Sequence, residues 1–357
     1  MAMKKMFCLF LILLNVVVPG VVLHAQAPGK GLFDEDSILD ITLSGNLKEL
    51  MNDRAEESKF HPLSISYFNP DSSLVTIPIT SKTRGHFRKQ AGVCTYPPLL
   101  LHFEKNETVI HSVFKDQVNL KLVMPCSGDE YVVHEWLAYK IYNLVTPKSF
   151  RARLVRVTLD DGHGKKKSPF YGILLEEEHQ MAKRNNCISV NRKIVPQQAD
   201  IPSYIDMVIF EYLIGNTDWS VQYLQNIKLI ADDSLSVPHT VPYDFDHAGL
   251  VNTPYAKPAD ELEMSSVRER RFRGFCIIDM KQYDPHIAFY NSIKADFYAL
   301  FTQNKILDPK FVKTSLQYLD EFYETINNPR DLQKAFGYPC DKNGKGNVII
   351  KGLKTDN

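Results

Sequence analysis

The sequence predicts an α+β protein built as two lobes, one rich in strands and the other rich in helices. In the first half, short runs of residues alternate between apolar and polar, which is the period of a half-buried strand. In the second half, apolar residues recur at the spacing of a helix, apart from one acidic hairpin. A chain of 357 residues is long enough for two lobes that enclose a cleft.

The first half contains most of the expected strands and one prominent helix. Residues 28–45 read as an irregular lead-in, and residues 46–60 have the apolar spacing of a helix. Residues 129–144, "DEYVVHEWLAYKIYNL", predict a longer amphipathic helix. Alternation predicts strands at 61–68, 73–85, 97–106, 117–124, 150–161 and 168–178.

The second half begins after a hinge that we expect within "ILLEEEHQM". Residues 203–216, "SYIDMVIFEYLIGN", predict a strongly apolar helix, and residues 226–246 predict a hairpin with an Asp-Asp-Ser turn. Further helices are expected at 285–302, 309–327 and 329–336. The expected divisions are a strand-rich lobe at 28–178, a helical lobe at 179–340 and a polar tail at 341–357.

The first 27 residues have the pattern of a signal peptide that is removed on export. Lys4 and Lys5 precede an apolar run, and the small residues Ala25 and Ala27 follow it. No later stretch is long and apolar enough to span a bilayer, so we expect a periplasmic or extracellular protein without an integral membrane span. The formal net charge of zero gives no support for a nucleic-acid partner.

Five cysteines follow the predicted signal peptide, and an oxidising compartment permits disulfides between them. An odd number leaves at least one unpaired within the chain. Cys94 with Cys126 is the first candidate for a bridge, although connectivity cannot be read from the sequence.

Two aspartates lie at the end of the predicted hairpin, in the stretch "VPYDFDHAG". Alternation along a strand would place Asp244 and Asp246 on one side, where two carboxylates repel unless a proton or a cation lies between them. Asp218 and Asn226 come earlier, in "GNTDWSVQYLQN". Phosphoryl-transfer enzymes use an aspartate to orient or deprotonate a hydroxyl, and Asn and Asp oxygens to hold Mg²⁺.

We therefore expect Asp218 to be the catalytic base and Asn226 and Asp244 to bind the metal. Asp246 is expected as a second ligand or as a hydrogen-bonded support. The alternative is a surface turn with two solvated acids.

The first half is expected to supply the groups that bind phosphate. Lys121 lies mid-strand among apolar neighbours, where an ammonium group needs a partner, and Glu135 in the following helix is the expected one. Arg84 and Arg88, in "TRGHFRKQ", are expected to contact phosphate. The alternatives are an outward, solvated Lys121 and two arginines that are ordinary surface charges.

The stretch "IGNTDWSVQYLQNIKLI", followed by "VPYDFDHAGL", resembles the CotH family of spore-coat kinase-like proteins. The family pattern is an Asn-x-Asp, a later Asn on a strand and a Pro-[WY]-Asp-x-Asp turn, which here fall on Asn216, Asp218, Asn226 and 242–246. The segment "FYGILLEEE" resembles the family's strand before the hinge, so that Glu177 joins the expected nucleotide-binding residues.

This resemblance implies a bilobal protein-kinase-like fold. It also implies ATP as the nucleotide, Mg²⁺ or Mn²⁺ as the metal, and transfer of the γ-phosphate to the hydroxyl of a protein whose identity the sequence does not give. The resemblance covers about residues 75–250. The region after residue 250 has no counterpart in it.

Other functions fit parts of the sequence. A catalytically inactive kinase-like module of the envelope or matrix would use the same fold without chemistry. A metal-dependent phosphohydrolase would use the double aspartate, but such sites usually need more His and Asp ligands, and only His247 adjoins the motif. The arginine-rich residues 268–273 fit a basic flap over phosphates, or a solvated helix end paired with nearby glutamates.

Overall fold

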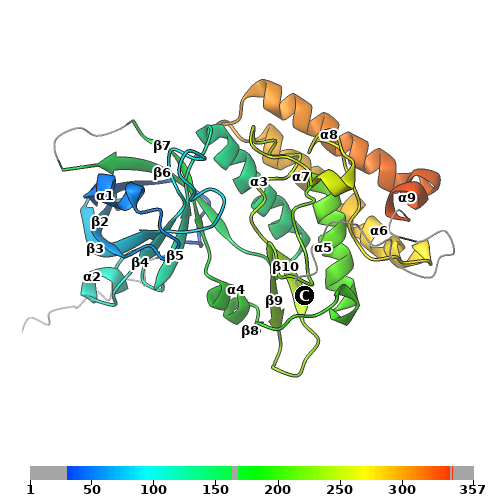
Figure 1. The fold of residues 1–357 in the computed structure, drawn as a ribbon, viewed down its shortest axis with the longest axis horizontal. Helices are drawn as coiled ribbons and strands as arrows, with labels where there is room; N and C mark the ends of the chain where they lie inside the picture. Colours follow the sequence, from blue (N-terminus) through cyan, green and yellow to red (C-terminus); the bar gives the residue numbers. More distant parts are fainter. Residues whose placement is uncertain (1–29, 163–167, 338–339, 341–357) are drawn as a thin grey trace, which may run out of the picture.

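The strands of the first half close into a seven-stranded barrel (Figure 1). The computed structural model describes residues 30–162, 168–337 and 340. In order around the barrel the strands are β1 (Leu39–Gly45), β2 (His61–Phe68), β3 (Leu74–Thr83), β4 (Leu99–His102), β5 (Asn119–Val123), β7 (Phe170–Leu175) and β6 (Ala152–Asp160). Neighbouring strands are antiparallel except β1 and β6, whose parallel pairing closes the barrel.

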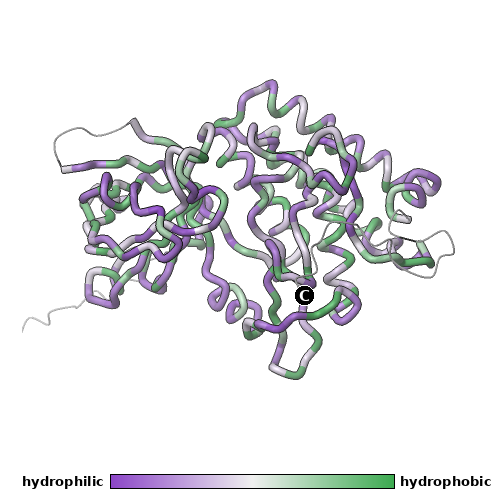
Figure 2. Tube along the Cα trace, in the orientation of Figure 1, coloured by the Kyte–Doolittle hydropathy of each residue, from purple (hydrophilic) through white to green (hydrophobic). Residues whose placement is uncertain are grey.

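Alternate residues along the strands form the core of the barrel, and the hydropathy of the chain alternates accordingly (Figure 2). Leu43, Ile65, Ile77, Leu101 and Leu120 are fully buried there. Two short helices, α1 (Leu47–Asn52) and α2 (Glu107–Ile110), pack against β3.

The predicted bilobal protein-kinase-like fold is wrong, because the strand-rich half is a closed mixed barrel. The error has an identifiable source in residues 39–45, "LDITLSG", which were expected to belong to an irregular lead-in. They form β1, the strand that pairs with both β2 and β6. Without β1 the other six strands make an open sheet, and with it the sheet has no free edge.

The larger helices gather beside the barrel (Figure 1). They are α3 (Asp129–Val145), α4 (Glu178–Arg184), α5 (Ile201–Ile214), α6 (Asp284–Ser292), α7 (Lys294–Thr302), α8 (Pro309–Asn327) and α9 (Pro329–Phe336). Helix α3 packs against β6 and β7 on one side and against α5 and α7 on the other, so it joins the barrel to the other helices. The helix expected at 285–302 is interrupted at Ile293, between α6 and α7.

A separate three-stranded sheet consists of β8 (Ile188–Val190), β9 (Ile227–Ala231) and β10 (His239–Pro242). Strands β9 and β10 are antiparallel, and Ile227 is opposite Pro242 at the end of the ladder. This confirms the hairpin that the sequence predicts. The candidate site residues at the ends of these two strands, residue 226 and residues 243–246, lie just beyond this last pair.

Two disulfide bridges occur in the described chain. The bridge between Cys94 and Cys126 confirms the predicted pair, and a second one joins Cys276 to Cys340. Cys187 is a free, buried thiol. The predicted signal peptide at 1–27 and the polar tail at 341–357 lie outside the described residues.

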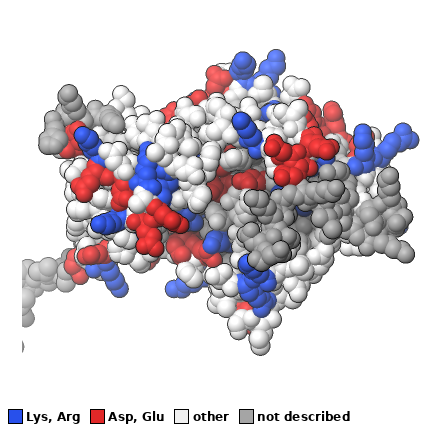
Figure 3. All heavy atoms as spheres, viewed as in Figure 1, with Lys and Arg blue, Asp and Glu red and all other residues white. Residues whose placement is uncertain are grey.

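None of the described helices combines the length and the apolar character that crossing a membrane requires. On the face drawn in Figure 3, positive and negative side chains are interspersed.

Candidate functional site

Asp218 lies in the loop that follows α5. The helix ends at Gly215, whose φ of 68° lies in the left-handed region that glycine adopts readily. The side-chain oxygen of Asn216 then accepts a hydrogen bond from the Asp218 N–H at 3.0 Å, and the Trp219 indole donates to the Asn216 carbonyl at 3.2 Å. Because Asn216 and Trp219 are buried, they fix the loop and leave Asp218 partly exposed.

Asn226 joins this loop to the β9–β10 hairpin. Its side-chain nitrogen donates to the backbone carbonyl of Asp218 at 2.7 Å and to the Asp218 carboxylate at 3.1 Å. The Gln225 amide donates to the other carboxylate oxygen. Asn226 has a φ of 51°, a conformation that Asn tolerates better than most residues. The structure thus brings Asp218 and Asn226 into direct contact.

The same hairpin brings Asp244 to the Asn226 end. The Tyr243 N–H donates to the Asn226 carbonyl at 3.0 Å, and the Asp244 N–H donates to the Tyr139 hydroxyl at 2.9 Å. Strand alternation does not govern the two aspartates, because β10 ends at Pro242 and Asp244 has a φ of 65°. Asp244 and Asp246 therefore have different surroundings.

Asp246 and Glu135 both face Arg88. The Arg88 Nη1 atom lies 3.7 Å from Asp246 Oδ2 and 3.9 Å from Glu135 Oε2, and the Tyr255 hydroxyl donates to Asp246 Oδ2 at 2.9 Å. The expected ion pair between Lys121 and Glu135 is not formed in the described chain, since Arg88 is the cation that lies beside Glu135. Asp246 has the contacts of a hydrogen-bonded support.

Three carboxyl groups share this one guanidinium group. Burial, and then the charges of Asp246 and Asp244, raise the pKa of Glu135 well above its ordinary value. Burial and the charge of Asp246 also raise the pKa of Asp244. Burial alone would lower the pKa of Arg88, but the surrounding Tyr255 and carboxylates raise it. An additional cation beside Asp244 would favour its ionised form.

Two lysines lie over the ring of Tyr243, and Arg84 is near both of them. The ammonium groups of Lys121 and Lys228 lie 4.9 Å and 5.9 Å from its centroid, and Arg84 is close enough to act on the pKa of both lysines. Glu178 binds Lys228 at 2.7 Å. Burial, followed by the charges of Arg84 and Lys228, lowers the pKa of Lys121 to about 8. Three neighbouring cations, of which Lys228 is paired with Glu178, form a suitable site for an anion.

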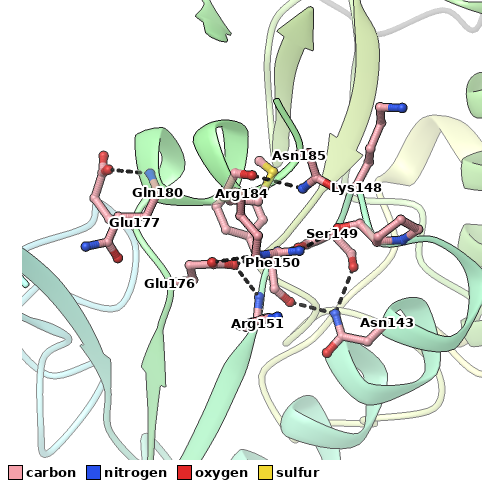
Figure 4. Close-up of polar contacts among 12 residues, drawn as sticks. Asn143, Lys148, Ser149, Phe150, Arg151, Glu176, Glu177, Gln180, Arg184 and Asn185 are labelled. Carbon is pink, nitrogen blue, oxygen red and sulfur yellow. Dashed lines mark hydrogen bonds and ion pairs between the residues drawn. The ribbon is translucent and has the colours of Figure 1, made fainter. Parts of the chain in front are cut away.

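The three glutamates around the start of α4 have separate roles, and Figure 4 shows the contacts of the first two, Glu176 and Glu177. Glu176 binds Arg184 through both carboxylate oxygens, at 3.0 and 2.9 Å. Glu177, predicted to bind nucleotide, instead caps α4 by accepting from two N–H groups in its first turn. Glu178 reaches the cations through Lys228.

Sequence reasoning missed several members of the site. Lys228 lies among apolar residues of a strand, in "NIKLI", as Lys121 does in its own strand. The reasoning that identified Lys121 could therefore have identified Lys228 as well. Tyr139 and Tyr255 give no local signal, because their contacts with Asp244 and Asp246 depend on how α3 and the 247–255 segment pack.

The donor set fits one Mg²⁺ ion only if the ligand supplies part of the coordination. Asn226 uses its amide nitrogen for Asp218, which leaves the amide oxygen for a cation, and Asp244, a partly exposed residue, offers a carboxylate. Mg²⁺ is usually held by one or two protein oxygens together with phosphate and water. Within the described ranges no group of three or more His, Cys, Asp or Glu side chains is arranged to hold a metal by itself.

No protein-family model matches the chain, and no curated protein is significantly similar to it. The resemblance to the CotH family therefore remains a prediction from the sequence motifs.

Proposed function

We propose that this protein is a CotH-like phosphotransferase that moves the γ-phosphoryl group of ATP, with Mg²⁺, to the hydroxyl group of a protein acceptor. One observation carries the proposal. The amide of Asn226 contacts both the backbone and the carboxylate of Asp218, and the hairpin brings Asp244 to the same end. A base and two oxygen donors thus meet beside a group of cations.

The residues have distinct roles in the proposed reaction. Asp218 accepts the proton of the acceptor hydroxyl, whose oxygen forms a bond to the γ-phosphorus. The bond from the γ-phosphorus to the bridging oxygen breaks, and ADP leaves with that oxygen. Asn226 and Asp244 hold Mg²⁺, which neutralises charge on the phosphates when bound. Asp246 and Arg88 fix the turn that carries Asp244.

Lys121, Arg84 and Lys228 bind the other phosphate oxygens in this proposal. The proximity of Arg84 and Lys228 to Lys121 supports it, since an anion among three cations lowers their mutual repulsion. The proposed site thus contains two of the five nucleotide-binding residues predicted in the first half, Lys121 and Arg84. Arg88 pairs with Glu135 and Asp246, and Glu177 caps α4.

We also propose that the protein acts after export, in the periplasm or outside the cell. The two disulfide bridges are compatible with an oxidising compartment.

A second candidate is a module that binds a phosphate-bearing ligand without transferring phosphate. The contacts of Asp246 favour this candidate, because Asp246 binds Tyr255 and Arg88 and is not available as a metal ligand. That leaves Asn226 and Asp244 to hold a metal. The two candidates share the cation site and differ at Asp218.

The experiment that separates them follows the γ-phosphate. The protein is incubated with γ-labelled ATP and Mg²⁺, and ADP and protein-bound phosphate are measured for the wild type and for Asp218→Asn. Asp233→Asn, at the far end of the same hairpin, is the matched control. Loss of ADP formation in Asp218→Asn alone supports transfer. Nucleotide binding with no ADP formation by the wild type supports the binding module.

A further inference from the structure

The arginine-rich segment 268–273 packs against the backbone around the candidate site. Arg268 donates to the Gly249 carbonyl at 3.0 Å, and Arg270 donates to the Leu213 carbonyl at the end of α5 at 3.3 Å. These arginines are neither directed outward as a solvated helix end nor arranged as a flap. They hold backbone carbonyls next to the loop of Asp218 and the turn of Asp244.

Arg273 makes the contact that bears most directly on Asp218. Its Nη1 atom donates to the carbonyls of Thr217 and Trp219, the second at 3.2 Å. These two residues flank Asp218 on either side. The guanidinium group also lies 5.8 Å from the centroid of the Trp219 ring. One cation therefore holds the carbonyl groups of the residues before and after the candidate base.

The other restraints on Asp218 are local or come from the hairpin. Asn216 binds the Asp218 N–H, and Asn226 and Gln225 bind its carboxylate. These bonds orient the side chain relative to the hairpin. Arg273 comes from 56 residues beyond Thr217 in the chain and fixes the loop to the helical part of the molecule.

The backbone of Arg273 is itself held on both sides. The Phe272 ring stacks on Phe336 with centroids 4.2 Å apart, and the Phe275 N–H donates to the Tyr204 hydroxyl at 3.2 Å. The next residue, Cys276, forms the bridge to Cys340. These anchors limit the movement that Arg273 allows the Asp218 loop.

We propose that Arg273 is a positioning residue that holds Asp218 in the geometry needed to accept the acceptor proton. The proposal rests on the proposed function. Both bonds come from the Nη1 atom of a planar guanidinium group, whose N–H directions are fixed, whereas a lysine offers a point charge on a flexible chain. Arg273→Lys is therefore expected to restore only part of what Arg273→Gln removes.

The experiment compares Arg273→Gln and Arg273→Lys with a matched control, Arg192→Gln. Arg192 also donates to two carbonyls two residues apart, those of Ser234 and Ser236, at the far end of the hairpin. Calorimetry gives the Kd for ATP with Mg²⁺, and ADP release with water as acceptor gives kcat. Misplacing a base typically costs about 10- to 100-fold in rate, which we expect for kcat of Arg273→Gln. Its Kd is expected to change less than about threefold, since the contacts described above go to the backbone and ring beside Asp218.

A second readout does not depend on activity. The chain has two tryptophans, so Trp136→Phe leaves Trp219 as the only one. In that background we expect Arg273→Gln to increase acrylamide quenching of Trp219, and Arg192→Gln to leave it unchanged.

Two results would overturn the proposal. One is a folded Arg273→Gln variant with unchanged kcat and unchanged quenching. The other is an equal loss of kcat, nucleotide affinity and thermal stability in Arg273→Gln that Arg273→Lys does not relieve, which indicates a purely structural role. Failure of the proposed function looks different, because the wild type would then not bind ATP with Mg²⁺, while Trp219 quenching would still report whether Arg273 holds the loop.

Discussion

At the scale of single residues, the site is governed by charges that burial has brought together. Arg88 faces both Glu135 and Asp246, and Lys121 lies near Arg84 and Lys228. The unusual position of Lys121 was visible in the sequence because an ammonium group rarely lies among apolar residues. Its partners were not visible, since they come from other strands and from a loop. The charged groups that lie close together in the site lead to predictions about pH.

The affinity for ATP with Mg²⁺ should fall as the pH rises through about 8, because Lys121 loses its proton there. A bound phosphate favours the charged ammonium, so binding near this pH should take up protons. Calorimetry in buffers of different ionisation enthalpy measures the uptake. Lys121→Gln should abolish it, and Lys82→Gln on β3 should not. Equal proton uptake in Lys121→Gln would assign the effect to another group.

Glu211 gives a prediction about stability. It is 1 % exposed within α5, and burial raises its pKa well above the ordinary 4.5. Between these two pKa values the unfolded chain has released a proton that the folded chain keeps, so stability falls as pH rises. Glu211→Gln should remove this slope and gain up to about 1.4 kcal/mol on the wild type for each pH unit in that window. Urea unfolding at pH 5, 6 and 7 measures it, and a constant difference would refute it.

At the scale of elements, the loop between β3 and β4 connects the barrel to the candidate site. The bridge from Cys94 to Cys126 ties it to the segment after β5, and Arg54 binds the carbonyls of Gln90 and Cys94 at 3.0 Å. Phe87 at its tip lies 6.1 Å from the His247 ring. The bridge was predicted, but the contact with the Asp246 turn was not, because a loop with few apolar residues carries no periodicity to indicate where it packs.

Replacing Cys94 and Cys126 with serine should therefore affect both stability and binding. Opening a bridge across 32 residues is expected to lower the free energy of unfolding by about 2–4 kcal/mol. It should also weaken the binding of ATP with Mg²⁺, because Arg88 is carried by this loop. Urea unfolding and calorimetry measure the two effects, with Cys187→Ala as the control for loss of a thiol. Unchanged nucleotide affinity would separate the loop from the site.

At the scale of the whole molecule, the order and type of the elements were largely predictable, but their closure was not. Six of the seven barrel strands, all except β1, appear where alternation predicts them. The major helices appear where helical spacing predicts them. Barrel closure depends on the seven-residue strand β1, six of whose residues pair with β6 more than a hundred residues later. Periodicity within a segment does not report such a partner, so the kinase-like fold was inferred from an incomplete sheet.

The barrel predicts a difference between neighbouring residues of β1. Leu43 is fully buried in the barrel, whereas Thr42 is partly exposed. Leu43→Ala should lower the free energy of unfolding by about 2–5 kcal/mol through the lost contacts and the cavity left behind. Thr42→Ala should cost far less. Urea unfolding followed by circular dichroism measures both, and equal costs would contradict the packing of β1 in the barrel.

The central claim is that Asn226 and Asp244 bind a metal–nucleotide complex beside Asp218. Calorimetric titration with ATP, in the presence and absence of Mg²⁺, tests it most directly when the wild type is compared with Asp244→Asn. Asparagine suits the φ of 65° at this position, so the variant removes the charge with little strain. The account predicts Mg²⁺-dependent binding by the wild type that weakens at least about tenfold in the variant. No binding by the folded wild type, or equal binding by both proteins, would contradict it.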